Sequence, residues 1–185
     1  FTDGSNARCV QGQSWLRVEL QLGDRAHLAK LGQALHSDVP VKPSWHDGQE
    51  YCYVQFNSAQ LCRSLSALGC VPNKTCRHGT PSLSPELYRH FYRGATDGDG
   101  SLLRVRQICA WRYECTGAER FIRDLQTWLM SNVGVSQTKL YRSGRAFIVR
   151  YTGGSQIERI ARLLYGDATV FLDRKFVQYT RLLAR

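Results

Sequence analysis

Phe91-Tyr92-Arg93-Gly94-Ala95-Thr96-Asp97-Gly98-Asp99-Gly100-Ser101 stands near the middle of a chain of 185 residues. It follows Ser84-Pro85-Glu86, which supplies a helix N-cap, a proline at the first helical position and an acidic first turn. The pattern predicts a helix from about Pro85 to Thr96 that ends on the Asp-Gly-Asp-Gly turn. Because Gly94 has no side chain, a second helix could approach this one closely.

The Asp-Gly-Ser end of this stretch occurs twice in the chain. Asp3-Gly4-Ser5 returns as Asp99-Gly100-Ser101 at an offset of 96 residues. Leu16-Arg17-Val18-Glu19-Leu20 returns in kind as Trp111-Arg112-Tyr113-Glu114-Cys115 at an offset of 95, each alternating apolar residues with Arg and Glu. Because the order of these matches is preserved, the sequence is interpreted as a duplication of one unit.

The sequence pattern of each copy predicts the same order of elements, ββαββα. The chain is therefore expected to have an α+β fold of two pseudo-symmetric repeats with antiparallel sheets. Alternation of apolar and polar residues marks the strands, and apolar residues three and four apart mark the helices. The expected strands are 6–10, 15–22, 40–46 and 50–57 in the first copy and 101–106, 109–116, 136–142 and 145–152 in the second. The expected helices are 24–36 and 58–68, then 118–130 and 155–165.

Composition favours a folded, basic protein. Apolar residues make up 43% of the chain, and 25 Lys and Arg against 15 Asp and Glu give a net charge of +10. Residues 91–185 hold 16 of the basic and 8 of the acidic residues, so we expect the second half to make more phosphate contacts. The odd count of seven cysteines, mostly in apolar stretches, indicates reduced thiols. With no signal peptide or apolar run of membrane-spanning length, the expected location is cytoplasm, nucleoid or organelle matrix, without secretion or membrane attachment.

The two Asp-Gly-Ser turns suggest a shared cation site. An EF-hand is excluded, because Ala95 and Arg106 stand where calcium ligands would be needed. If a pseudo-two-fold axis relates the copies, the two turns meet near it, and their carboxylates repel unless a cation such as Mg²⁺ bridges them. A single Asp-Gly-Ser, by contrast, is most simply a helix end with a turn-forming Asp. Cys70, Cys76 and His78 match no common zinc spacing and lack an obvious fourth ligand.

These motifs resemble those of the LAGLIDADG homing endonucleases. Residues 91–101 resemble the dodecapeptide of that family, and Phe1-Thr2-Asp3-Gly4-Ser5 resembles the tail of its first copy. Gly69-Cys70-Val71-Pro72-Asn73-Lys74-Thr75 resembles the family's Gly…Asn-Lys-Ser/Thr segment. Leu164-Tyr165-Gly166-Asp167-Ala168 through Asp173-Arg174-Lys175 resembles the matching segment of the second copy. The resemblance covers essentially the whole chain.

The resemblance implies a monomeric, site-specific, Mg²⁺-dependent endonuclease that cuts double-stranded DNA at a long target. It places the two catalytic, metal-holding acids at Asp3 and Asp99, with Gly98 as a further metal ligand, and the assisting bases at Lys74 and Lys175. Asp97 corresponds to an earlier motif position and is interpreted as a helix-end group. The implied repeats are 1–83 and 84–185, each with a saddle-shaped sheet, joined at dodecapeptide helices of which the second is 85–98. Only two residues precede Asp3, so the first such helix is expected to be missing from this chain.

Outward-facing strand residues are expected to contact DNA, because Arg, Gln and Glu suit base edges in the major groove. An ordinary solvated sheet face with cross-strand ion pairs explains any one of them equally well. Arg104 and Arg106 are expected to share one face of their strand. The expected DNA-binding residues are Arg17, Glu19, Gln21, Lys42, Ser44, Arg104, Arg106, Arg112, Glu114, Lys139, Tyr141 and Arg145.

The leading functional hypothesis is therefore a homing endonuclease that promotes mobility of an intron or intein. Its alternative is a DNA- or RNA-binding maturase or transcription regulator on the same fold, without cleavage. A basic RNA-binding domain is a third interpretation, which predicts no preference for duplex DNA. An in vitro cleavage assay with and without Mg²⁺ separates the first two.

Overall fold

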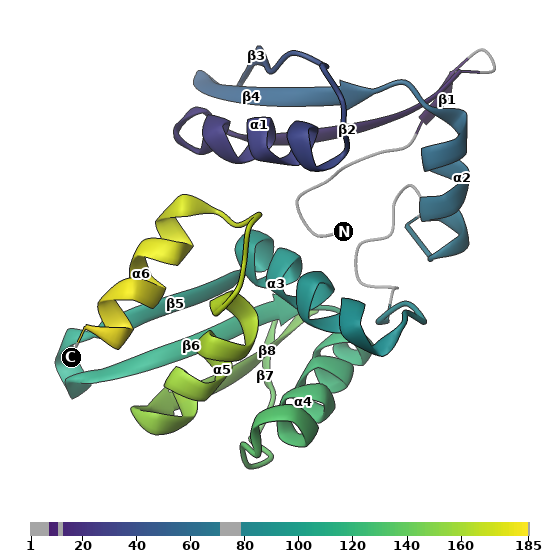
Figure 1. Cartoon of the computed structure of the whole chain (residues 1–185). Helices are drawn as coiled ribbons and strands as arrows, with labels where there is room; N and C mark the ends of the chain where they lie inside the picture. Colours follow the sequence, from purple (N-terminus) through teal and green to yellow (C-terminus); the bar gives the residue numbers. More distant parts are fainter. Residues whose placement is uncertain (1–7, 11–12, 71–78, 185) are drawn as a thin grey trace. The chain divides into compact units, whose positions relative to one another are not determined.

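The computed structural model describes residues 8–10, 13–70 and 79–184, which form two compact units (Figure 1). The first unit is Phe1–Lys74 and the second is Thr75–Arg185. The division falls before the expected repeat boundary at residue 83. Thr80 belongs with the second unit, because its backbone N–H donates to Asp124 (2.9 Å) and its hydroxyl bonds that of Tyr92 (2.8 Å).

The first unit has one antiparallel sheet with strand order β1-β2-β4-β3. Its strands are β1 (Arg8–Val10), β2 (Gln13–Gln21), β3 (Lys42–His46) and β4 (Gln49–Phe56). The helices are η1 (Leu22–Asp24), α1 (Arg25–Ala34) and α2 (Ala59–Ala67). Ser58 caps α2 by accepting a hydrogen bond from the Leu61 N–H (3.2 Å), a partner that the first turn of a helix otherwise lacks.

The second unit repeats this arrangement with strand order β5-β6-β8-β7. Its strands are β5 (Gly100–Val105), β6 (Ala110–Gly117), β7 (Tyr141–Ser143) and β8 (Ala146–Gly153). The helices are η2 (Pro85–Leu87), α3 (Tyr88–Asp99), η3 (Arg106–Ile108), α4 (Glu119–Val133), α5 (Ser155–Tyr165) and α6 (Asp173–Leu183). The two sheets share one topology, so the predicted α+β fold of two ββαββα repeats is confirmed.

The two units differ in the size of their cores. In the first, Leu28, Cys52, Val54 and Phe56 are buried, with a few partly buried residues around them. In the second, alternate residues of β6 and β8 meet the apolar faces of the helices in a much larger buried cluster. On α4 the cluster takes up a helical stripe of Phe121, Ile122, Leu125 and Leu129. In the described residues, the second unit therefore buries more apolar surface and is expected to be the more stable.

Two expected elements differ in the structure, and one element was not expected. The central helix does not end at Thr96, because α3 continues to Asp99. The strand expected at 136–142 is reduced to β7 at Tyr141–Ser143. Helix α6 was not predicted, although its buried Lys175, Tyr179 and Leu182 recur at helical spacing. It contacts β5 and α5 and contributes to the candidate site.

Candidate functional site

The C-terminal turn of α3 carries two aspartates with different surroundings. Asp97 is buried and accepts hydrogen bonds from the Tyr165 hydroxyl (2.7 Å) and the Leu172 backbone N–H (3.1 Å). Asp99, the last residue of α3, is exposed. Residues two apart on a helix are rotated by about 200°, so the two carboxylates leave α3 in different directions. Asp97 is thus a packing anchor, whereas Asp99 is exposed at the end of the helix.

Lys175 of α6 lies beside this turn. Its side chain is buried, and its Nζ donates to the carbonyl oxygens of Gly100 and of Thr96 (3.4 Å for the latter). Thr96 and Gly100 bracket Asp99 along the chain, so α6 brings a lysine next to the predicted catalytic acid from far along the sequence. The structure thereby places Asp99 and Lys175 in one neighbourhood.

Cys115 of β6 lies in the field of both groups. Burial and, to a lesser extent, the Asp99 carboxylate raise the pKa of the Cys115 thiol to about 12, against a lowering effect of Lys175. Burial also raises the pKa of Tyr113 well above its ordinary value. The buried Cys115 and Tyr113 are therefore both uncharged at neutral pH.

The raised Cys115 pKa predicts that the protein loses stability in alkali. The thiol ionises near pH 9 in the unfolded chain and near pH 12 in the folded protein. The stability that this difference in pKa contributes is therefore fully present below pH 9 and is lost as pH rises toward 12. At pH 10.5 the loss from Cys115 alone is about 2 kcal/mol. Urea unfolding at pH 8 and 10.5 measures it. Cys115→Val should show a smaller alkaline loss than the parent, and equal losses would contradict the argument.

Two of the predicted catalytic residues, Asp3 and Lys74, lie outside the described residues, as do Cys76 and His78. Within residues 8–10, 13–70 and 79–184 there is no group of three or more His, Cys, Asp or Glu that could hold a metal ion. The chemistry at Asp99 nevertheless fits Mg²⁺, which takes oxygen ligands and needs only one or two protein carboxylates. The C-terminal end of a helix also favours a cation through its dipole. Asp99 and the Gly98 carbonyl are the described groups that could hold one.

The open face of the first sheet carries a connected polar cluster. Arg17 pairs with Glu19, donates to the Ser44 hydroxyl (3.0 Å) and lies over the Tyr53 ring (3.7 Å to its centroid). His46 lies 2.7 Å from Glu19 and 2.9 Å from the Ser44 oxygen. The predicted residues Arg17, Glu19 and Ser44 therefore lie together. His46 and Tyr53 were not predicted, although their positions opposite Gln49 and Glu19 follow once the strand register is known.

Gln21 and Lys42 lie on this same face. Gln21 is opposite Tyr51 on β4, and Lys42 is opposite Tyr53. Directly paired residues of antiparallel strands share a face of the sheet. Both side chains are exposed. The face therefore presents charged groups, amides and tyrosines together.

The second sheet repeats this arrangement. Glu114, opposite Arg150 on β8, pairs with that arginine and lies 3.6 Å from the Arg112 Nε. That Nε is buried and has no hydrogen-bond partner in the described part of the chain. Arg150 in turn lies over the ring of Tyr141, 4.8 Å from its centroid. Arg112 and Glu114 stand where Arg17 and Glu19 stand in the first unit, so the duplication extends to the polar face.

The expectation that Arg104 and Arg106 share one outward face of their strand was wrong. Arg104 is paired with the buried Trp111, so it lies on the helix-covered side of the sheet, opposite to the face of Arg112. Arg106 is not on the strand, because β5 ends at Val105 and η3 begins. Alternation along a strand in the sequence predicts which residues share a face. Whether that face is open or covered by helices becomes known only from the pairing of β5 with β6.

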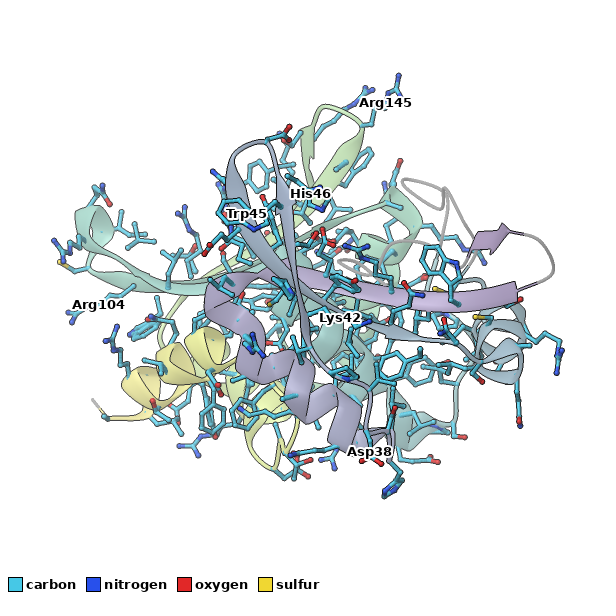
Figure 2. All side chains as sticks on the ribbon, turned by 90° about the horizontal axis from the view of Figure 1, so that it is seen from above. Asp38, Lys42, Trp45, His46, Arg104 and Arg145 are labelled. Atoms are coloured by element: carbon cyan, nitrogen blue, oxygen red, sulfur yellow. The ribbon has the colours of Figure 1, made fainter. Side chains whose placement is uncertain are left out.

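The remaining two predicted residues lie at the far end of the second sheet. Lys139 is exposed and precedes β7. Arg145 is exposed in the turn between β7 and β8, and Figure 2 shows it projecting away from the sheet, distant from Arg104. No helix in the described part of the chain is both long and apolar enough to cross a membrane.

Comparison with known proteins identifies the fold. No protein-family model and no curated protein sequence matches this chain. The meganuclease I-SmaMI, in a structure bound to uncleaveable DNA, superposes with a TM-score of 0.64 at 12% identity, over 99% of this chain and 84% of that one. The LAGLIDADG meganuclease I-AabMI, bound to uncleaved DNA, gives 0.60 at 11% identity, over 99% and 86%. Full-length DUF199/WhiA from Thermatoga maritima gives 0.60 at 12%, over 99% and 56%. The chain has the LAGLIDADG homing endonuclease fold.

Proposed function

We propose that this protein is a site-specific endonuclease that hydrolyses double-stranded DNA with a divalent cation, and that it acts as a monomer on a long target. The observation that carries the proposal is that Lys175 of α6 donates to the carbonyls of Thr96 and Gly100, on either side of the exposed Asp99 at the end of α3. The DNA-bound meganucleases of the same fold support it. Promotion of intron or intein mobility would follow from such cleavage.

Each residue at this site has a separate part in the proposal. Asp99 would hold the cation through its carboxylate, and the carbonyl of Gly98 would add a second oxygen. The chemistry such a cation supplies is activation of water and stabilisation of the leaving oxygen. Lys175 places its positive charge where it stabilises the negative charge that builds up on the phosphate. Asp3 and Lys74 are proposed as their counterparts in the first copy, on the sequence match alone.

Selection of cleaved sites from a random duplex library tests this function directly. The full chain is incubated with the library in Mg²⁺ and, separately, in EDTA, and cut molecules are sequenced. A shared sequence recovered only with Mg²⁺ is the expected result. Absence of any cleaved product in Mg²⁺ or Mn²⁺, from protein that binds the library, would overturn the endonuclease proposal.

A non-cleaving nucleic-acid-binding protein is the second candidate. The observation in its favour is that WhiA, named as a DUF199 protein rather than as a meganuclease, has the same fold. A maturase or regulator of this kind predicts specific binding that neither needs Mg²⁺ nor changes with the charge of Asp99. A protein that prefers RNA in competition with duplex DNA would support RNA binding instead.

Arg112 is expected to read one base of the target. Its Nε has no hydrogen-bond partner in the described residues, and its neighbour Glu114 is shared with Arg150. Arg112→Ala should relax the selected sequence at one position, by about 1–3 kcal/mol of discrimination, while preferences elsewhere persist. Repeating the site selection with the variant measures this. Arg123→Ala, on the exposed side of α4, is the control and should reproduce the parent sequence.

A further inference from the structure

A cleft of about 850 Å³ lies between the edge strand β5 and helix α6 of the second unit, which lie side by side (Figure 1). This volume falls within the roughly 300–1,000 Å³ of sites that hold small molecules. Five basic side chains line the cleft, and neither Asp nor Glu is among its lining residues. They are Arg104, Arg106, Arg174, Lys175 and Arg181. The lining therefore favours an anionic ligand.

Arginine side chains stand on both walls of the cleft. On α6, Arg174, Gln178 and Arg181 are four and three residues apart, so they lie along one face of the helix, and its rise separates the two arginines by roughly 10 Å. On β5, Arg104 is paired with the buried Trp111, which turns its side chain to the helix-covered side of the sheet. One phosphate cannot reach guanidinium groups this far apart. The spacing therefore suits several linked phosphates.

The arginines of the cleft differ from several others of the second unit. Arg89, Arg123 and Arg162 each pair with a carboxylate at 2.6–2.8 Å. Three arginines of the cleft are exposed, and their side chains form no hydrogen bond or ion pair among the described residues; they are Arg104, Arg106 and Arg181. A guanidinium group without an internal partner is available to donate two hydrogen bonds to a phosphate.

The cleft lies on the other side of the sheet from the residues expected to contact DNA bases. Arg112 and Glu114 alternate along β6 with the buried Trp111, Tyr113 and Cys115, so they lie on the open face. A duplex read on that face leaves Arg104 on the far side of the sheet. The charges of the cleft therefore indicate a second ligand, separate from the target DNA.

Part of the lining is apolar. Leu102 and Trp111, both buried, line the cleft together with Leu103. Sites for small molecules combine such apolar lining with a few charged groups that fix the orientation of the ligand. Inorganic phosphates would use the arginines alone, whereas a nucleotide would also place its base against the apolar residues.

We propose that the β5–α6 cleft binds a small soluble ligand that carries a triphosphate group. Arg104, Arg106 and Arg181 bind the phosphates, and the apolar lining contacts the base where the ligand is a nucleotide. The inference goes beyond the proposed endonuclease and does not depend on it, because none of these three arginines belongs to the candidate active site. Lys175 is shared by the cleft and that site.

Calorimetric titration of the full chain with inorganic triphosphate, ATP and AMP tests the proposal. EDTA is present, so that no cation joins a phosphate to Asp99, and near-physiological salt screens exposed charges more than about 8 Å apart. Both triphosphates should bind, and AMP should bind at least about tenfold more weakly, because it meets fewer of the arginines. Tighter binding of ATP than of inorganic triphosphate would support a nucleotide, and equal binding would support the phosphate chain alone as the ligand. Binding of neither triphosphate would overturn the site.

A pair of double variants locates the binding. Arg104→Gln with Arg181→Gln should weaken triphosphate binding by about tenfold for each arginine removed. The charge-matched control is Arg123→Gln with Arg159→Gln on α4 and α5, which also changes exposed side chains and should bind as the parent does. Equal losses in the two variants would show that affinity follows net charge, and would overturn the site.

Cys109 gives a second measurement that needs no substitution. It is exposed and lines the cleft, whereas Cys52, Cys62 and Cys115 are buried. Saturating triphosphate should slow alkylation of Cys109 several-fold, measured by peptide mass spectrometry with Cys70 of the first unit as the internal reference. An unprotected Cys109 in a protein that binds triphosphate would place the ligand elsewhere and overturn the site.

These outcomes are separate from those of the endonuclease proposal. A protein that cuts selected DNA sites but binds no triphosphate overturns the cleft site and leaves the endonuclease in place. A protein that binds triphosphate with protection of Cys109, but never cuts DNA, supports the cleft site and rejects the endonuclease.

Discussion

Replacing Asp99 by asparagine is expected to reduce DNA cleavage by about a hundredfold or more, while the protein stays folded and still binds its target. The variant keeps the size of the side chain but loses the negative charge that would hold the cation, and losses of one charge-stabilising group at an active site are of this order. Asp99 is exposed at the end of α3, so the expected change in stability is within about 0.5 kcal/mol. Single-turnover cleavage of a selected site measures the effect.

The matched control is Glu119→Gln, which removes one exposed carboxylate from α4 of the same unit. It should cut at the parent rate. Full cleavage by the Asp99 variant would show that the proposed mechanism is wrong. If binding and cleavage fell together, Asp99 would be holding the DNA in place, and the chemistry would need another residue.

The fold was predictable because its signals are local and occur twice. Alternation over 15–22 and 109–116 marked strands that became β2 and β6, and the paired Asp-Gly-Ser turns placed the repeat. The buried alternation of Trp111, Tyr113 and Cys115 was expected and is confirmed. A duplicated pattern strengthens every such prediction, since each copy tests the other.

The site was less predictable because it depends on contacts far apart in sequence. Gly98 and Gly100 read as signals that end a helix, yet α3 continues to Asp99, with the hydrogen bonds of Asp97 to Tyr165 and Leu172 holding the last turn. Helix α6 is mostly polar on its exposed side, so its stripe of buried residues was not recognised. Both errors concern elements whose stability comes from tertiary packing, which local propensity does not report.

Asp97→Ala, unlike Asp99→Asn, is expected to destabilise the protein. It should lower the free energy of unfolding by about 3–5 kcal/mol. The change leaves the Tyr165 hydroxyl and the Leu172 N–H without their buried acceptor. It also removes an opposite charge near Arg93, whose pKa is lowered by burial and raised by Asp97. Arg93 itself is buried and donates to the carbonyls of Val170 (3.0 Å) and Leu164 (3.4 Å), so it cannot turn out to water without breaking these contacts.

Urea unfolding of the full chain measures this loss, with Trp15 and Trp45 of the first unit replaced by phenylalanine in all variants so that the tryptophan fluorescence reports on the second unit. Tyr165→Phe is the graded control, because it removes only one of the two donors to Asp97 and should cost about 1–2 kcal/mol. The loss in Asp97→Ala should exceed that in Tyr165→Phe, since only the former leaves a buried arginine without its opposing charge. An Asp97→Ala protein as stable as the parent would mean that Asp97 is not an anchor. The different roles assigned to the two aspartates of α3 would then have to be reconsidered, because burial and hydrogen bonding are what distinguish Asp97 from Asp99.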